Sequence, residues 1–179
     1  MEFRKREIFT GKLFDVPTHV VRLDGKKTHG WQLRYGKWTL FSDHSNDGTG
    51  AEAALAAASA ELARRIAKLP APNGIRSQSK EGKANGMPVG VSGPITRMRG
   101  RQNALQYYLQ VNFPIPGGKP VNRTIYIATE NTLTPEKYQT ALAKAIAIRD
   151  TGVRKFKLAA TKAKRESAGI SSVASRGAG

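Results

Sequence analysis

Hydrophobic and polar residues alternate in six short stretches of this chain, and the stretches form two series with the same order. Alternation with a period of two residues is typical of a strand that has one buried and one exposed face. Each series therefore predicts a three-stranded antiparallel sheet. The stretches are 19–23, 30–35 and 37–41 in the first series, and 94–98, 107–111 and 122–126 in the second.

The phase of the alternation predicts which side chains point inward. Apolar side chains take one phase of each strand, and polar or aromatic side chains take the other. The predicted inward residues are Val21, Leu23, Trp31, Leu33, Tyr35, Trp38 and Leu40 in the first series, and Tyr107, Leu109, Val111, Phe113, Ile125 and Ile127 in the second.

An alanine-rich segment with helical spacing follows each series. Thr49 and Glu52 form a capping-box pattern before the first helix, and Pro70 ends that helix. Thr134 supplies an N-cap hydroxyl before Pro135, the proline at the first helical position of the second helix. The apolar stripes expected to face the sheets are Leu55, Leu62, Ile66 and Leu69 in the first helix, and Tyr138, Leu142 and Ile146 in the second.

These elements predict an α+β fold with two small modules, each a three-stranded antiparallel sheet packed on one α-helix, plus a basic C-terminal tail. An internal repeat of this size favours two modules over one domain. The predicted parts are a basic N-terminal arm at 1–17, the first module at 18–70, a flexible glycine-containing linker at 71–90, the second module at 91–152 and a basic, partly disordered tail at 153–179.

The charge of the chain indicates what kind of partner it binds. The 30 Lys and Arg residues exceed the 13 Asp and Glu residues, so the formal net charge is +17. Residues 153–179 alone hold seven basic residues and one acidic residue. Such an excess predicts a polyanionic partner, of which nucleic acid is the commonest, and the tail would add affinity without sequence preference.

Several other classes of protein are not indicated. The chain has no cysteine, which excludes disulfides, thiolate zinc sites and a cysteine nucleophile. No stretch reaches the roughly 20 apolar residues of a membrane span, and the N-terminus does not have the pattern of a signal peptide. We therefore expect a cytoplasmic, nucleoid-associated protein with no cofactor and no membrane contact.

One helix can cover only one face of each sheet, so the other face is predicted to be exposed. Arg, Gln and Asn side chains suit base edges, while Thr and Tyr suit phosphate oxygens or thymine methyl groups. We expect such residues on the exposed faces to contact DNA. They are Arg22, Gln32, Arg34, Lys37 and Thr39 in the first module, and Arg97, Arg99, Arg101, Tyr108, Gln110, Asn112, Thr124 and Tyr126 in the second.

The order of strands and helix, the arginine-rich first strand, the aromatic second strand and the alanine-rich helix resemble the plant ethylene-response-factor (APETALA-type) DNA-binding domain and its phage and bacterial relatives. In that family the exposed face of the sheet binds the major groove. The resemblance implies DNA contacts for Trp31 as well, and it is stronger in the second module. This chain departs from the family at 90–94, where Pro94 interrupts the family's Gly-Val-Arg opening, and in its longer hairpin at 114–120.

An enzyme is not indicated. The spacing of His19, His29 and His44 matches no metal-binding motif, and the 117–119 segment lacks the Ser or Thr of a phosphate-binding loop. We expect a non-enzymatic, double-stranded DNA-binding protein, acting as a transcriptional regulator or recombination accessory factor of a bacterium, phage or mobile element. Three alternatives stay open: a nucleoid-type architectural protein, an RNA-binding protein that stacks bases on Tyr108 and Tyr126, and a phage inhibitor that occupies the nucleic-acid channel of a host protein.

Overall fold

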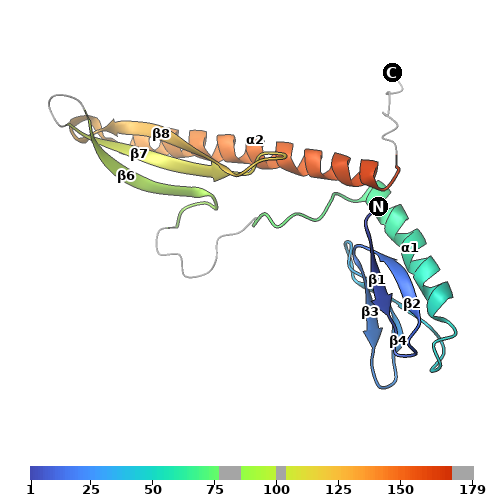
Figure 1. Ribbon diagram of the computed structural model, residues 1–179. Coiled ribbons are helices and arrows are strands. Elements are labelled where there is room, and N and C mark those ends of the chain that lie inside the picture. The colour runs from blue at the N-terminus through green and yellow to red at the C-terminus, as the bar shows by residue number, and fades with distance from the viewer. Residues whose placement is uncertain (77–85, 100–103, 171–179) are drawn as a thin grey trace. The chain divides into compact units, whose positions relative to one another are not determined.

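The computed structural model describes residues 1–76, 86–99 and 104–170. Its described residues form an α+β chain with three antiparallel sheets, of two, three and three strands, and two α-helices (Figure 1). Contacts divide the chain into two compact units. Unit 1 contains residues 1–72 together with residues from 160 onward, and unit 2 contains residues 73–159.

Unit 1 combines a two-stranded hairpin, a three-stranded sheet and a helix. The hairpin pairs β1 with β2, and the sheet, called sheet B, has the strand order β3-β4-β5. The elements are β1 (Phe3–Glu7), β2 (Leu13–Pro17), β3 (Val20–Asp24), β4 (His29–Leu33), β5 (Thr39–Ser42) and α1 (Ala51–Lys68).

The core of unit 1 forms where α1 packs on sheet B. Ala51 and Ala58 are fully buried at this contact. Their small methyl side chains allow the helix to lie close to the sheet. Trp31 is fully buried in the same core, and its indole Nε1 donates a 2.7 Å hydrogen bond to the carbonyl oxygen of Ala51. Of the predicted helical stripe, Leu55, Leu62 and Ile66 are buried, while Leu69 follows the end of α1 and is partly exposed.

The first 17 residues differ from the predicted basic arm. They form the β1–β2 hairpin, whose Phe14 and Val16 belong to the same core as α1 and sheet B. The Phe14 ring meets the Trp31 ring edge-on, with 5.7 Å between centroids. The basic residues of β1 are exposed, so the segment combines a charged outer face with an inner face that completes the core.

Unit 2 contains a longer three-stranded sheet, called sheet C, with the strand order β6-β7-β8. Figure 1 shows α2 running along one face of this sheet. The helix uses Ala141 and Ala145 for close contact, against buried Leu109, Val111 and Ile125. The elements are β6 (Val91–Arg99), β7 (Ala104–Phe113), β8 (Val121–Thr129), the short 3-10 helix η1 (Glu130–Thr132) and α2 (Pro135–Ser167).

The helix α2 begins at Pro135 as predicted, and it runs past the predicted module boundary at residue 152. It continues to Ser167, and its residues from 160 onward belong to unit 1. Gly152 lies inside the helix, at a position where a β-carbon would collide with the ring of Phe113. The end of the helix is not a free tail: Arg165 Nε donates a 3.3 Å hydrogen bond to the carbonyl of Ile66, and Ile170 packs against the core of unit 1.

The predicted linker at 71–90 also differs in part, although residues 77–85 lie outside the described residues. Met87 is buried in the core of unit 2, and the hydroxyl of Tyr138 donates to its sulfur at 3.4 Å. Residues just after the undescribed stretch are therefore part of the folded unit.

The hairpin at the N-terminus gives a first prediction. Val16 is fully buried, so Val16→Ala should lower the free energy of unfolding by about 2 kcal/mol, through two lost methyl groups and the cavity they leave. Leu13→Ala in the same strand is the control, because Leu13 is exposed. Chemical denaturation of the full chain measures both. Equal, small effects would mean that residues 1–17 are an arm after all.

Candidate nucleic-acid interface

The face of sheet C that α2 does not cover, called here the open face, carries a regular set of polar and aromatic side chains. As predicted, Leu109, Val111 and the β8 isoleucines point toward α2, so the residues between them point the other way. The register of β7 and β8 arranges the outward residues in cross-strand rows: Tyr108 opposite Tyr126, Gln110 opposite Thr124, and Asn112 opposite Asn122.

Arg97 extends the open face onto β6, where it pairs in register with Gln106. Its guanidinium carbon lies 5.5 Å from the centroid of the Tyr108 ring, which is cation–π geometry. The Tyr108 ring also meets the Tyr126 ring edge-on at 5.5 Å, and its hydroxyl donates to Gln106. The Arg97 side chain is exposed and makes no ion pair within the described residues. It is a solvent-accessible cation held in place by an aromatic platform.

The polar rows next to this cluster are also accessible. Asn112 and Asn122 are exposed, and the Asn112 amide donates a 2.9 Å hydrogen bond to Asn122 Oδ1. Thr124 is exposed, and its partner Gln110 is half-buried. Successive rows on one face lie about 7 Å apart, and three strands span about 10 Å of backbone. The open face therefore offers donors and acceptors at a spacing of about two base-pair steps, since B-DNA rises about 3.4 Å per step.

The other two arginines predicted on this strand cannot be placed in the cluster. Arg99 is the last residue of β6, in register with Ala104, and its side chain lies outside the described residues. Arg101 lies outside them entirely.

In sheet B the predicted phase of β3 is wrong. Arg22 pairs in register with Trp31, on the face that α1 covers, and Val21 and Leu23 point to the open face. Trp31 has no exposed surface, and the Arg22 side chain is only 6% exposed and stacks on its ring at 4.9 Å. Neither residue is available for DNA, contrary to the expectation from the sequence.

Arg22 is inward because it neutralises a buried carboxylate. Its Nη1 and Nη2 donate to the two oxygens of Asp43 at 2.9 and 2.6 Å, and its Nε donates to Asp24 at 2.9 Å. Burial alone would lower the pKa of Arg22, but the hydrogen bonds to both aspartates outweigh it and raise that pKa. Burial likewise opposes ionisation of Asp24, yet hydrogen bonds from Arg22 and His29 lower the pKa of that carboxyl.

The phase of β5 is wrong as well. Leu33, which points toward α1, is in register with Thr39, so Thr39 also points inward and accepts a 2.7 Å hydrogen bond from Arg65 Nη2. Leu40 and Trp38 are exposed instead, Trp38 to 65%.

Three of the residues predicted in sheet B do lie at its open face or rim. Arg34 is exposed, donates to Gln32 at 2.6 Å and stacks on Trp38 at 5.1 Å. Lys37 is exposed in the turn before β5. Val21, Leu23 and Leu40 surround them, so this face is more apolar than that of sheet C.

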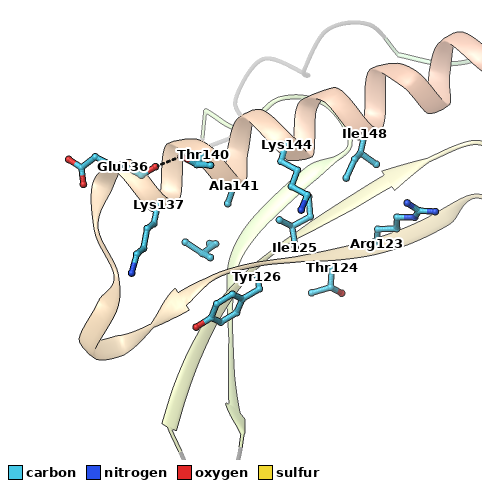
Figure 2. Close-up of a pocket in the computed structure, with 11 residues that line it drawn as sticks. Arg123, Thr124, Ile125, Tyr126, Glu136, Lys137, Thr140, Ala141, Lys144 and Ile148 are labelled. Carbon is cyan, nitrogen blue, oxygen red and sulfur yellow. Dashed lines mark hydrogen bonds between the residues drawn. The ribbon is translucent and has the colours of Figure 1, made fainter.

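A groove that the alternating pattern of the strands does not indicate lies between β8 and α2. One cavity of about 680 Å³ adjoins another of about 340 Å³, and the two share Arg123, Lys144 and Ile148. In Figure 2, Lys144 and Ile148 extend from α2 toward β8, while Thr124 and Tyr126 lie on the far side of the strand. The sequence contains one indication of this surface. Lys144 and Lys155 are 11 residues apart, which is about three helical turns, so they lie on the same face of α2. The charged lining residues are Arg123, Glu136, Lys137, Lys144 and Lys155.

Comparisons with known proteins do not assign this chain to a family. The sequence matches no protein-family model and no curated protein, and the fold matches no solved structure. Within the described residues there is no group of three or more His, Cys, Asp or Glu that could hold a metal ion. In the same part of the chain, neither helix has the length and apolar composition needed to cross a membrane.

The buried ion pair gives a second prediction. Arg22→Met keeps the volume but leaves Asp43 buried without its partner, so the free energy of unfolding should fall by about 3 kcal/mol. Arg34→Met is the matched control and should change it little, because Arg34 is exposed.

The hydrogen bonds from Arg22 and His29 to Asp24 make the stability of the fold depend on pH. Because the folded protein lowers the pKa of Asp24, its stabilising contribution is complete above the ordinary value of 3.8 and is lost as the pH falls toward the lowered value. Denaturation at pH 7 and in acid measures this loss of stability.

The substitution experiment also has a contradicting outcome. If Arg22→Met were as stable as Arg34→Met, the Arg22 side chain would not be needed in the core and would be free to bind DNA.

Proposed function

We propose that the protein binds double-stranded DNA, with the open face of sheet C in the major groove. The observation that carries the proposal is the gathering of Arg97, Tyr126, Gln110, Thr124 and Asn112 on one uncovered sheet face of a chain with a net charge of +17. Arginine reads guanine, and glutamine or asparagine reads adenine, through paired hydrogen bonds to base edges.

The dimensions support this mode of binding. Three strands span about 10 Å of backbone, and the major groove of B-DNA is about 12 Å wide. Arg97 starts from the position of an outer strand, and its exposed guanidinium is already oriented by the Tyr108 ring. An arginine that is ordered before binding loses less conformational entropy when it meets a base.

The two units have different roles in this proposal. Unit 2 reads sequence through sheet C. Unit 1 has lost Arg22 and Trp31 to its own core, so it contributes affinity through exposed cations such as Arg34 and Lys37. The resemblance of the sequence pattern to the ethylene-response-factor type of DNA-binding domain would imply the same binding mode, and in this proposal only the second module uses it. The biological role that we propose is that of a transcriptional regulator or recombination accessory factor.

Single-stranded RNA is the less favoured ligand, because Arg97 and Tyr126 contact the Tyr108 ring on which a base would have to stack. A base-stacking platform needs exposed aromatic faces. Tyr108 is only 8% exposed, with Arg97 over its ring and Tyr126 against it, although Tyr126 itself is 50% exposed. One accessible ring gives a weak platform.

The charge of the chain gives a third prediction. Phosphate contacts release counterions, so duplex affinity should fall by roughly three to five powers of ten between about 50 and 200 mM salt if about six to ten phosphates are contacted. Fluorescence anisotropy with a labelled duplex measures the slope. A flat response would contradict any nucleic-acid function.

The position of Arg97 gives a fourth prediction. Arg97→Ala should weaken binding to a duplex selected from a random library by about 1–3 kcal/mol, and should change binding to unrelated duplexes much less. Lys119→Ala is the control: Lys119 is exposed in the 114–120 turn of the same unit, and its loss should be small and equal on all sequences. If Arg97→Ala behaved like the control, the sheet would act only as an electrostatic surface, as in an architectural protein.

A further inference from the structure

The strand β8 has an open edge. It is the last strand of sheet C in the order β6-β7-β8, so among the described strands nothing pairs with its outer side. Its register with β7 is unbroken from Tyr126 to Val121, and the stretch contains no proline. Proteins usually protect such edges with proline, bulges or short strands, because the free N–H and C=O groups can pair with another chain. Along the unbroken stretch this edge has no proline and no bulge, and Arg123 is its one charged residue.

The groove described above follows this edge on the side of α2. Its floor is apolar where Ile125 and Ile148 line it. Its rim is cationic: Lys144 and Lys155 make no hydrogen bond or ion pair within the described part of the chain, and Arg123 makes only a ring contact with Phe113. Glu136 is the single acidic residue that lines either cavity. This place therefore offers backbone hydrogen bonds at the edge of β8, apolar contact on the floor of the groove and positive charge at its rim.

The occupant must satisfy all three. A second copy of this chain is disfavoured, because pairing β8 with β8 would bring two sets of Arg123 and Lys144 together. A nucleic-acid strand would neutralise the cations, but it would leave the apolar floor and the backbone groups of β8 unused. An extended peptide can pair with the strand edge, bury aliphatic side chains on the floor and place carboxylates at the rim.

We propose that the β8 edge binds an extended acidic peptide segment of a partner protein, as a fourth strand of sheet C. Every second residue of the segment lies on the side of α2, with an acidic residue opposite Arg123 and aliphatic residues opposite Ile125 and Ile127. The site uses the free edge of β8 and its α2 side, whereas the open face uses the other side of the same strand, so the peptide proposal does not rest on the proposed DNA binding.

The test uses a nine-residue peptide with threonine at alternate positions. Glutamate, isoleucine, isoleucine and glutamate fill the other positions, so the pattern is the same in both strand directions. Two derivatives carry N-methyl groups on alternate backbone nitrogens, one derivative for each edge of the peptide. The full chain should bind the unmodified peptide, and amide NMR shifts should change at residues 121–127. One derivative should bind at least about tenfold more weakly and the other should bind equally, because only one edge of the peptide pairs with β8.

Charge reversal provides the matched variants. Lys144→Glu should weaken peptide binding by about fivefold to tenfold, and Lys119→Glu, the same charge change on the 114–120 turn, should weaken it much less. Both lysines are exposed, so both variants should keep the thermal stability of the parent chain.

Three results would overturn the proposal: no binding of the peptide, equal binding of both methylated derivatives, or equal effects of the two lysine variants. A nine-nucleotide dT strand is the competing probe. If it binds with a dependence on Lys144 that the peptide lacks, the groove is a nucleic-acid channel and not a peptide site.

Discussion

Each three-stranded sheet of this protein is covered by one helix, and this constraint decides what every strand residue can do. A side chain on the covered face must be apolar or fully paired, while a side chain on the other face is free to bind. Function therefore depends on the phase of each strand. In sheet C the buried residues of the covered face are apolar, with Arg123 exposed at its rim, and the open face holds Arg97, Gln110 and Thr124. In sheet B the covered face includes Arg22. This residue is the counterpart of Arg97 in the first repeat, and its burial in the core makes it unavailable to a partner.

The two units thus share a plan but differ in what they can offer to a partner. Sheet C keeps polar groups in cross-strand rows, whereas sheet B keeps Val21, Leu23 and Leu40 on its open face. The β8–α2 groove adds a second surface to unit 2, whereas a unit 1 cavity of about 420 Å³ lies between β2 and α1. If both proposals hold, one unit combines a DNA-reading face with a peptide-binding edge, which would connect DNA occupancy to a protein partner.

The sequence was sufficient for the elements of sheet C and for the start of α2. There, aliphatic residues occur at every second position, as in Leu109 and Val111, and only one phase buries them. It was insufficient for β3, where Val20 and Val21 fit either phase equally well. The choice depends on Asp43, which lies 21 residues beyond Arg22 and whose burial no local pattern reveals. The module boundary placed at residue 152 falls inside α2, because the glycine there allows the ring of Phe113 to approach the helix and does not mark an end.

The central claim is that the open face of sheet C, and not that of sheet B, reads DNA. The most direct test is modification of arginine side chains in the full chain with phenylglyoxal, followed by mass spectrometry, with and without a duplex selected from a random library. The account predicts that Arg97 reacts in the free protein and is protected by the duplex, that Arg22 is unreactive in both states, and that Arg34 reacts in the free protein and is protected less than Arg97. Strong protection of Arg34 with Arg97 still reactive would contradict it.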